Sequence, residues 1–141
     1  LGILFNRDHV SFGTMMDGGA TSLFECLETE CVGRPRERGT ASLNHPMHAG
    51  FAYFLYRCVA GIRPLTPGFG EFEIRPDHFD GIPSADVTYE TPYGTVAVSF
   101  VRRGRETVYS FRVPVNTTCR FRAGGRSEVY GSGSYTVTVT E

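Results

Sequence analysis

Apolar and polar residues alternate with a period of two through the second half of the chain, and this pattern constrains the fold more than any other feature. The alternation recurs in six short runs, centred on residues 72–74, 87–89, 96–100, 109–113, 119–121 and 135–139. Turn-forming sequences separate several of these runs: Pro92-Tyr93-Gly94, Arg103-Gly104-Arg105 and Ala123-Gly124-Gly125. Short alternating strands with regular turns are typical of an antiparallel sandwich. We therefore predict a mainly β fold, a jelly-roll-like antiparallel β-sandwich, over residues 64–141.

The first 63 residues lack this alternation and predict a short helical segment. We expect residues 1–20 to be irregular or weakly helical, and residues 31–42 to form a loop. A short helix is predicted over residues 21–30, where Thr21 or Ser22 can cap the first turn. A longer helix is predicted over residues 46–62, with Asn44 as its cap and Pro46 tolerated in its first turn.

The predicted helix over residues 46–62 is apolar on nearly every side, and only Arg57 is charged after His48. A helix that is apolar all round is normally buried all round. Because one small sandwich cannot cover both of its sides, we expect a larger helical layer against it. Without that layer, an apolar face stays uncovered, and such a face favours a homodimer.

Composition bounds the possible classes of function. The chain has 141 residues, 40% of them hydrophobic and 13% aromatic, which is enough for a packed core in one domain, or in one domain plus a piece of another. The net charge of −1 argues against a general nucleic-acid binder, and no stretch is long enough to span a bilayer. The chain begins at Leu1 without a signal-peptide pattern, so we expect a piece of a longer protein whose compartment cannot be read.

The cysteines and histidines do not form a recognisable metal site. Four cysteines occur, at positions 26, 31, 58 and 119, without a CxxC pair, and we predict free thiols. His45 and His48 are close in sequence, with Cys26 and Cys31 not far away, but neither a carboxylate nor a CxxC pair completes a ligand set. We therefore expect no metal and no cofactor.

Glu25 is the strongest catalytic candidate that the residues themselves offer. It lies among Leu23, Phe24 and Leu27, close to the start of the predicted helix. A carboxylate among apolar neighbours near a helix start is a candidate acid or base. The alternative is an ordinary solvated glutamate, which is the commoner role of a helical Glu.

Two ordered motifs frame this candidate: Gly-Ala-Thr-Ser-Leu-Phe-Glu at residues 19–25, and Ser-Leu-Asn-His-Pro-Met at residues 42–47. Together they resemble the end of the catalytic domain of bacterial α-L-rhamnosidases. The likeness continues through residues 56–57, 60–64, 67–69, 75–76 and 92–96. It implies an inverting glycoside hydrolase in which an (α/α)6 barrel precedes a C-terminal β-sandwich. Residues 1–63 would then close the barrel, and residues 64–141 would form the sandwich.

The resemblance also implies roles for individual residues. Glu25 takes the position of the general base, and His45, Phe24 and Asn44 take positions that contact a rhamnose-containing glycoside. The general acid of the family lies far upstream, so the isolated chain is expected to be inactive. Where the family usually has tryptophan, this sequence has Phe24 and Leu27, and it contains no tryptophan at all. We expect Glu25 and His45 to face one shared, open surface, although His45 could instead be a helix-entry residue satisfied by nearby backbone.

Two other classes of function fit the same sequence. One is a non-catalytic β-sandwich module that binds carbohydrate or packs on a neighbouring domain. The other is a free-standing structural or interaction protein.

Overall fold

The chain divides into two compact units, Leu1–Phe51 and Ala52–Glu141. The computed structural model describes residues 2–8, 11–25 and 42–140. Each unit is described separately below.

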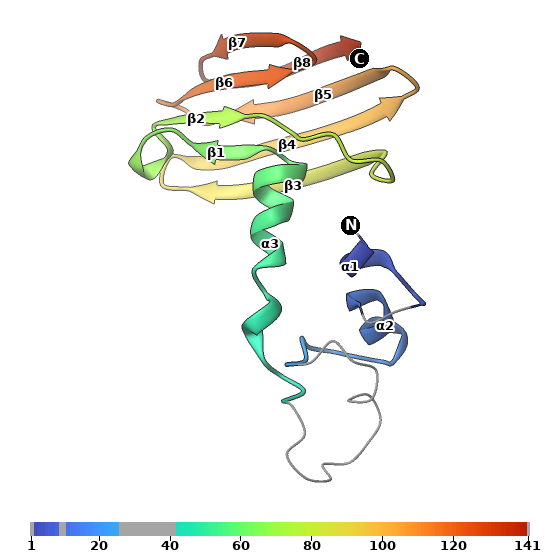
Figure 1. Ribbon diagram of the computed structural model, residues 1–141. Helices are drawn as coiled ribbons and strands as arrows, with labels where there is room; N and C mark the ends of the chain where they lie inside the picture. Colours follow the sequence, from blue (N-terminus) through green and yellow to red (C-terminus); the bar gives the residue numbers. More distant parts are fainter. Residues whose placement is uncertain (1, 9–10, 26–41, 141) are drawn as a thin grey trace. The chain divides into compact units, whose positions relative to one another are not determined.

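The second unit is a sandwich of two four-stranded sheets (Figure 1). One sheet has the order β1-β2-β6-β7, from strands Ile62–Pro64, Glu71–Ile74, Thr118–Ala123 and Arg126–Tyr130. The other has the order β3-β4-β5-β8, from strands Ser84–Thr91, Gly94–Arg103, Glu106–Val113 and Gly133–Thr140. All neighbours pair antiparallel except β2 and β6, which are parallel. The predicted mainly β sandwich, with a short helical segment before it, is confirmed.

The core between the sheets follows from the period-two pattern. In β4, β5 and β8 buried positions alternate with more exposed ones, and every buried position except Thr107 is apolar. Aromatic rings join the two sheets: Phe121 of β6 stacks on Phe111 of β5 at 5.1 Å between centroids, and meets Tyr109 edge-on at 5.3 Å. These contacts fix the two sheets face to face.

All six predicted runs are strands, and two further strands were not predicted. β1 has only three residues and falls where the sequence suggested the end of a helix. β7 follows the predicted turn at Gly124-Gly125, but its burial hardly alternates, and Val129 is 66% exposed. Both strands form through pairing with a neighbour rather than through a strong pattern of their own.

The predicted continuous helix over residues 46–62 is wrong. The chain instead forms a 3₁₀ turn at Pro46–His48 (η2), a four-residue helix at Phe51–Phe54 (α3) and a π-helical turn at Leu55–Val59 (η3), and then enters β1. The cap of the first turn is His45, not Asn44. The side chain of Tyr53 is 64% exposed, so one apolar side of this segment is uncovered in this chain, as we expect without a larger helical layer.

The η3 turn closes the open side of the sandwich. It contacts β1 and β3, which are the edge strands of the two sheets (Figure 1). Val59 and Ala60 enter the core there, where they pack with Ile62 and Ile74. The sandwich itself thus buries the last apolar residues of the predicted helix.

In the described residues of the first unit, two short α-helices precede η2: α1 at Gly2–Phe5 and α2 at Phe12–Asp17. α2 begins with a capping box, in which Ser11 and Thr14 exchange side-chain to backbone hydrogen bonds. The helix predicted over residues 21–30 is wrong for residues 21–25, which form bends and irregular chain; residues 26–41 lie outside the described residues.

None of the helices in the described ranges has both the length and the apolar character needed to cross a membrane.

Candidate functional site

Main-chain hydrogen bonds pair the two motif segments within the first unit. The Glu25 amide donates to the Ser42 carbonyl oxygen at 2.8 Å, and the His45 amide donates to the Leu23 carbonyl oxygen at 2.8 Å. The segment ending at Glu25 therefore lies beside the segment ending at His45, although sixteen intervening residues, 26–41, are outside the described part.

The Glu25 side chain is held by this pairing. Its Oε2 atom accepts a hydrogen bond from the Ser42 amide at 2.8 Å. Its carbonyl oxygen lies 2.9 Å from Nε2 of His48, so the backbone at Glu25 is fixed from a second side. The sequence predicted Glu25 inside a helix, whereas the structure places it at a bend. A single amide of the neighbouring segment, rather than the start of a helix, orients the carboxylate.

His45 lies at the entry of η2. Its Nδ1 atom accepts a hydrogen bond from the Met47 amide at 3.2 Å. A ring nitrogen that accepts an N–H bond carries no proton, so the neutral imidazole has its proton on Nε2. The backbone thereby orients the His45 ring, as expected if His45 is a helix-entry residue satisfied by nearby backbone. The ring keeps one N–H donor, at Nε2.

The two other predicted contact residues differ in accessibility. Phe24 is only 7% exposed and packs with Phe12 and Met15 in the small core of the first unit. Asn44 is exposed, and its amide oxygen accepts a hydrogen bond from the Ser22 hydroxyl at 2.7 Å. Packing is thus the observed role of Phe24, while Asn44 is accessible to a ligand. That Glu25 and His45 face one shared surface stays a prediction.

Among the described residues, no three His, Cys, Asp or Glu side chains are grouped as a metal site would require. Cys58 and Cys119 are free thiols, whereas Cys26 and Cys31 lie outside the described ranges. Burial raises the pKa of the Cys119 thiol to about 12, so it stays protonated at neutral pH. Burial, followed by a hydrogen bond to Asp77, also raises the pKa of the Cys58 thiol.

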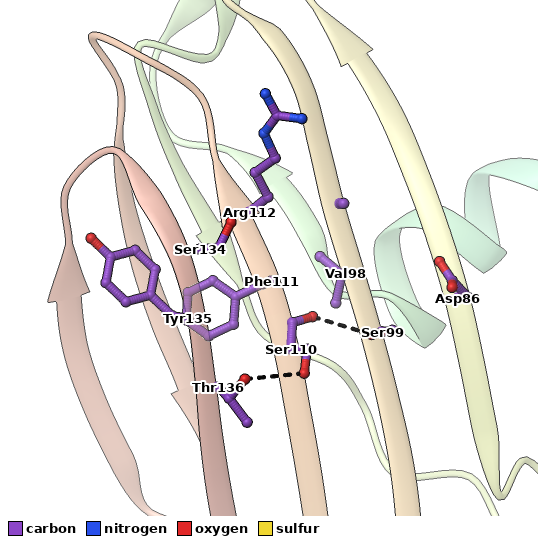
Figure 2. A pocket seen from close by; sticks show the side chains of 10 residues that line it. Asp86, Val98, Ser99, Ser110, Phe111, Arg112, Ser134, Tyr135 and Thr136 are labelled. Carbon is purple, nitrogen blue, oxygen red and sulfur yellow. Dashed lines mark hydrogen bonds between the residues drawn. The ribbon is translucent and has the colours of Figure 1, made fainter.

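The second unit has a wide hollow on the sheet formed by β3, β4, β5 and β8 (Figure 2). Its volume is about 340 Å³. The hydroxyls of Ser110 and Thr136 lie 3.3 Å apart, and the Ser99 hydroxyl donates to the Ser110 carbonyl oxygen. The hydrogen-bonding capacity of these three neighbouring side chains is thus used within the sheet, as in the cross-strand hydroxyl pairs of many solvated sheets.

A smaller hollow, of about 200 Å³, lies where η3 meets the sandwich edge. We name it the tyrosine hollow and define it by its lining residues: Tyr53, Tyr56, Arg57, Ile62, Pro64, Phe69 and Tyr89. The sequence did not predict it, because Tyr53 and Tyr56 were assigned to a buried helix and Tyr89 to an alternating strand. Only the spacing of the two tyrosines, three residues apart on an apolar segment, hinted at a shared aromatic face.

Comparison with known proteins places the chain in a family. The family described as "Bacterial alpha-L-rhamnosidase C-terminal domain" matches residues 61–134, which is more than half of the chain. An α-L-rhamnosidase of Formosa agariphila is 30% identical over 119 residues, covering 82% of this chain and 13% of that protein. One from Streptomyces avermitilis is 28% identical over 117 residues, covering 82% of this chain and 11% of that protein.

Solved structures of α-L-rhamnosidases agree with this family match. The crystal structure of Streptomyces avermitilis α-L-rhamnosidase, complexed with L-rhamnose, matches 98% of this chain and 16% of its own, with a TM-score of 0.81 at 26% identity. Native α-L-rhamnosidase from Aspergillus terreus, at 21% identity, shares the fold over 95% of this chain and 16% of its own, with a TM-score of 0.84. The chain thus spans only a small part of the relatives that it matches. It belongs to the bacterial α-L-rhamnosidase family, and residues 61–134 form that family's C-terminal domain.

Proposed function

We propose that the chain is the C-terminal part of an inverting α-L-rhamnosidase that removes terminal rhamnose from glycosides, with Glu25 as the general base. Family membership supports the parent activity, and the Streptomyces avermitilis relative is described as bound to L-rhamnose. The observation that carries the proposal is the pairing of the two motif segments. It brings Glu25 beside Ser42 and leaves His45 only three residues further along.

Inversion requires two carboxyl groups roughly 6.5–9.5 Å apart, with a water molecule between the base and the sugar. In this proposal Glu25 takes the proton from that water. Ser42 fixes one carboxylate oxygen through its amide; among the described residues, Oε1 accepts no hydrogen bond and is available to the water. The Nε2–H of His45 and the amide of Asn44 would then donate to sugar hydroxyls. The general acid would come from a segment upstream of Leu1, and residues 1–63 would complete its barrel.

Glu25→Gln in the full-length protein tests the role of the base. The amide oxygen of glutamine can still accept the Ser42 N–H, so the local fold is preserved while the base is lost. Removal of a general base typically lowers the rate by ~10²–10⁴. We expect kcat on 4-nitrophenyl α-L-rhamnopyranoside to fall by that factor, with a smaller change in KM.

Glu90→Gln is the matched control, because Glu90 lies exposed on β3 and contacts only the Thr95 hydroxyl among described groups. That variant should keep normal activity. The isolated 141-residue chain should not hydrolyse the same substrate. A Glu25→Gln enzyme as active as the Glu90→Gln enzyme would exclude Glu25 as the base, and turnover by the isolated chain that Glu25→Gln abolishes would contradict the need for an upstream acid.

The alternative is a non-catalytic sandwich module that binds carbohydrate or packs on a neighbouring domain. The tyrosine hollow favours carbohydrate binding, because it gathers aromatic side chains on the sandwich unit without Glu25. The predicted homodimer through the exposed apolar face that includes Tyr53 and Tyr56 is a separate proposal. Sedimentation velocity of the isolated chain over a hundredfold concentration range tests it.

A further inference from the structure

We propose that the tyrosine hollow, whose lining does not include Glu25, is a binding site for one sugar ring of a glycoside. The choice of a sugar as ligand rests on the proposed carbohydrate-related function of the sandwich. The location of the site rests only on residues of the second unit.

The aromatic rings form a walled depression. Tyr56 meets Tyr89 edge-on at 5.4 Å between centroids, and Phe69 lies against Tyr89 at 5.1 Å with an interplanar angle of 33°. The volume of about 200 Å³ is below the ~300–1,000 Å³ of pockets for drug-sized ligands, which suits a single ring. An aromatic face packs well against the C–H groups on one side of a pyranose.

Two unusual backbone features meet at this depression. Phe69 has φ of 67°, a left-handed conformation that is costly for a residue with a bulky side chain. Tyr56 and Arg57 belong to η3, and π-helical turns are rare and frequent at functional sites. A fold needs neither feature to close a sandwich edge, yet both direct aromatic or charged side chains into the same hollow.

The rim offers polar groups. Across the residues that the structure describes, no protein group hydrogen-bonds to the hydroxyls of Tyr53, Tyr56 or Tyr89, nor to the guanidinium of Arg57. That guanidinium instead lies 5.7 Å from the centroid of the Tyr53 ring. Aromatic walls with hydroxyl and guanidinium donors at the edge complement a sugar, which has apolar faces and a belt of hydroxyls.

Hydrogen bonds and an ion pair from β1 and the following chain hold the end of η3, which carries part of the hollow. Arg63, which is buried in β1, donates from Nε to the Arg57 carbonyl oxygen at 3.2 Å and forms an ion pair with Asp77 at 3.2 Å. The Asp77 amide donates to the Cys58 carbonyl oxygen at 2.8 Å. These bonds fix the last turn of η3, so that the rings of the hollow need little ordering when a ligand binds.

The wider hollow on the sheet formed by β3, β4, β5 and β8 is a weaker candidate. Its hydroxyls bond to one another and to the strands, and the ring of Phe111 belongs to the core between the sheets. Tyr135 also lines it, but its ring packs against Phe111 and Tyr130 and its hydroxyl donates to the Gly131 carbonyl oxygen, so both aromatic groups of this hollow already have partners.

Binding to the intact 141-residue chain tests the proposal. Methyl α-L-rhamnopyranoside and methyl α-D-glucopyranoside are titrated, and amide shifts are followed by ¹H–¹⁵N NMR. Tyrosine fluorescence gives a second readout, which is direct because the chain has no tryptophan. We expect saturable shifts at residues 53–57, 69 and 89 with at least one of the two sugars. Tyr56→Ala should weaken this binding at least tenfold, and Tyr89→Phe, which keeps the ring, should weaken it less.

Tyr93→Ala is the control, since Tyr93 is an exposed tyrosine on the β3–β4 turn and does not line the hollow. Thermal melts establish that each variant folds. Glu25→Gln should bind as the unmodified chain does, so a failure of the catalytic proposal leaves this result unaffected. The proposal is overturned if neither sugar produces saturable shifts there, or if Tyr93→Ala weakens binding as much as Tyr56→Ala. It is also overturned if the shifts at these residues depend on protein concentration alone, which would assign the surface to a second copy of the chain.

Discussion

Gly61 offers the sharpest test of how the helical turn is joined to the sandwich. It lies between η3 and β1 with φ of 75°, and its carbonyl oxygen accepts the Arg75 amide at 2.9 Å. A Cβ atom at this position would lie 2.2 Å from the carbonyl carbon of Arg75 and 2.2 Å from the nitrogen of Pro76. Both are backbone atoms, so no rotamer change can relieve the overlap.

The cost of Gly61→Ala has two parts. The left-handed conformation costs an alanine ~1–2 kcal/mol. Relief of the overlap must move the chain at Arg75-Pro76 away from Gly61, next to the β1–β2 pair of Ile62 with Ile74. We expect a total loss of about 3–5 kcal/mol, in the upper range for single substitutions. For a domain of this size, that corresponds to a fall in Tm of roughly 10–30 °C.

Gly104→Ala isolates the conformational part. Gly104 has φ of 61° in the β4–β5 turn, and a Cβ atom added there would meet nothing within 4 Å. Its loss should be ~1–2 kcal/mol. Urea unfolding followed by far-UV circular dichroism measures both variants against the unmodified chain. Equal losses for the two variants would refute the argument that close backbone approach, rather than φ alone, requires glycine at position 61.

Two further predictions concern ionisable groups. Burial raises the pKa of the Cys119 thiol from 9.0 to about 12, so the contribution of this thiol to stability is complete below pH 9 and is lost as the pH rises from 9 towards 12. Cys119→Ala should flatten that part of the stability–pH profile. An unchanged slope in the variant would contradict this prediction. A hydrogen bond from the Tyr130 hydroxyl, and to a smaller extent one from Arg126, lowers the pKa of the exposed Glu128 carboxyl. Tyr130→Phe should therefore raise the Glu128 pKa in an NMR titration, whereas Tyr135→Phe should leave it unchanged.

The strands could be predicted from the sequence because their pattern is local. In β4, β5 and β8 buried residues alternate with more exposed ones and, apart from Thr107, are apolar, so a strand with one buried face is the simplest solution. β1 and β7 could not be predicted in this way. β1 is stabilised by its partner β2, and β7 is the outer strand of a hairpin that projects Val129 into solvent.

The candidate site was predicted in part. The motif residues Glu25 and His45 were singled out, and the pairing of their two segments is consistent with one site, but the helix expected around Glu25 is absent from residues 21–25. Local sequence suggested a helix there because Thr21 and Ser22 can act as caps. The hydrogen bonds to residues 42–45 come from a distant part of the chain, and no local pattern reports them. The His45 ring, rather than Asn44, caps η2, because Nδ1 of histidine can reach the Met47 amide.

Residues 51–62 are apolar on nearly every side, and the two sides of this segment have different surroundings in the structure. The sandwich buries Val59, Ala60 and Ile62 at its open edge, and this accounts for one side of the segment. The other side carries Tyr53 and Tyr56, whose rings are apolar but whose hydroxyls can remain in water. A segment meant only for burial would not need two hydroxyl groups on its outer side. Tyrosine at both positions is instead suited to a surface that stays accessible in the folded unit, which is what a sugar-binding hollow requires.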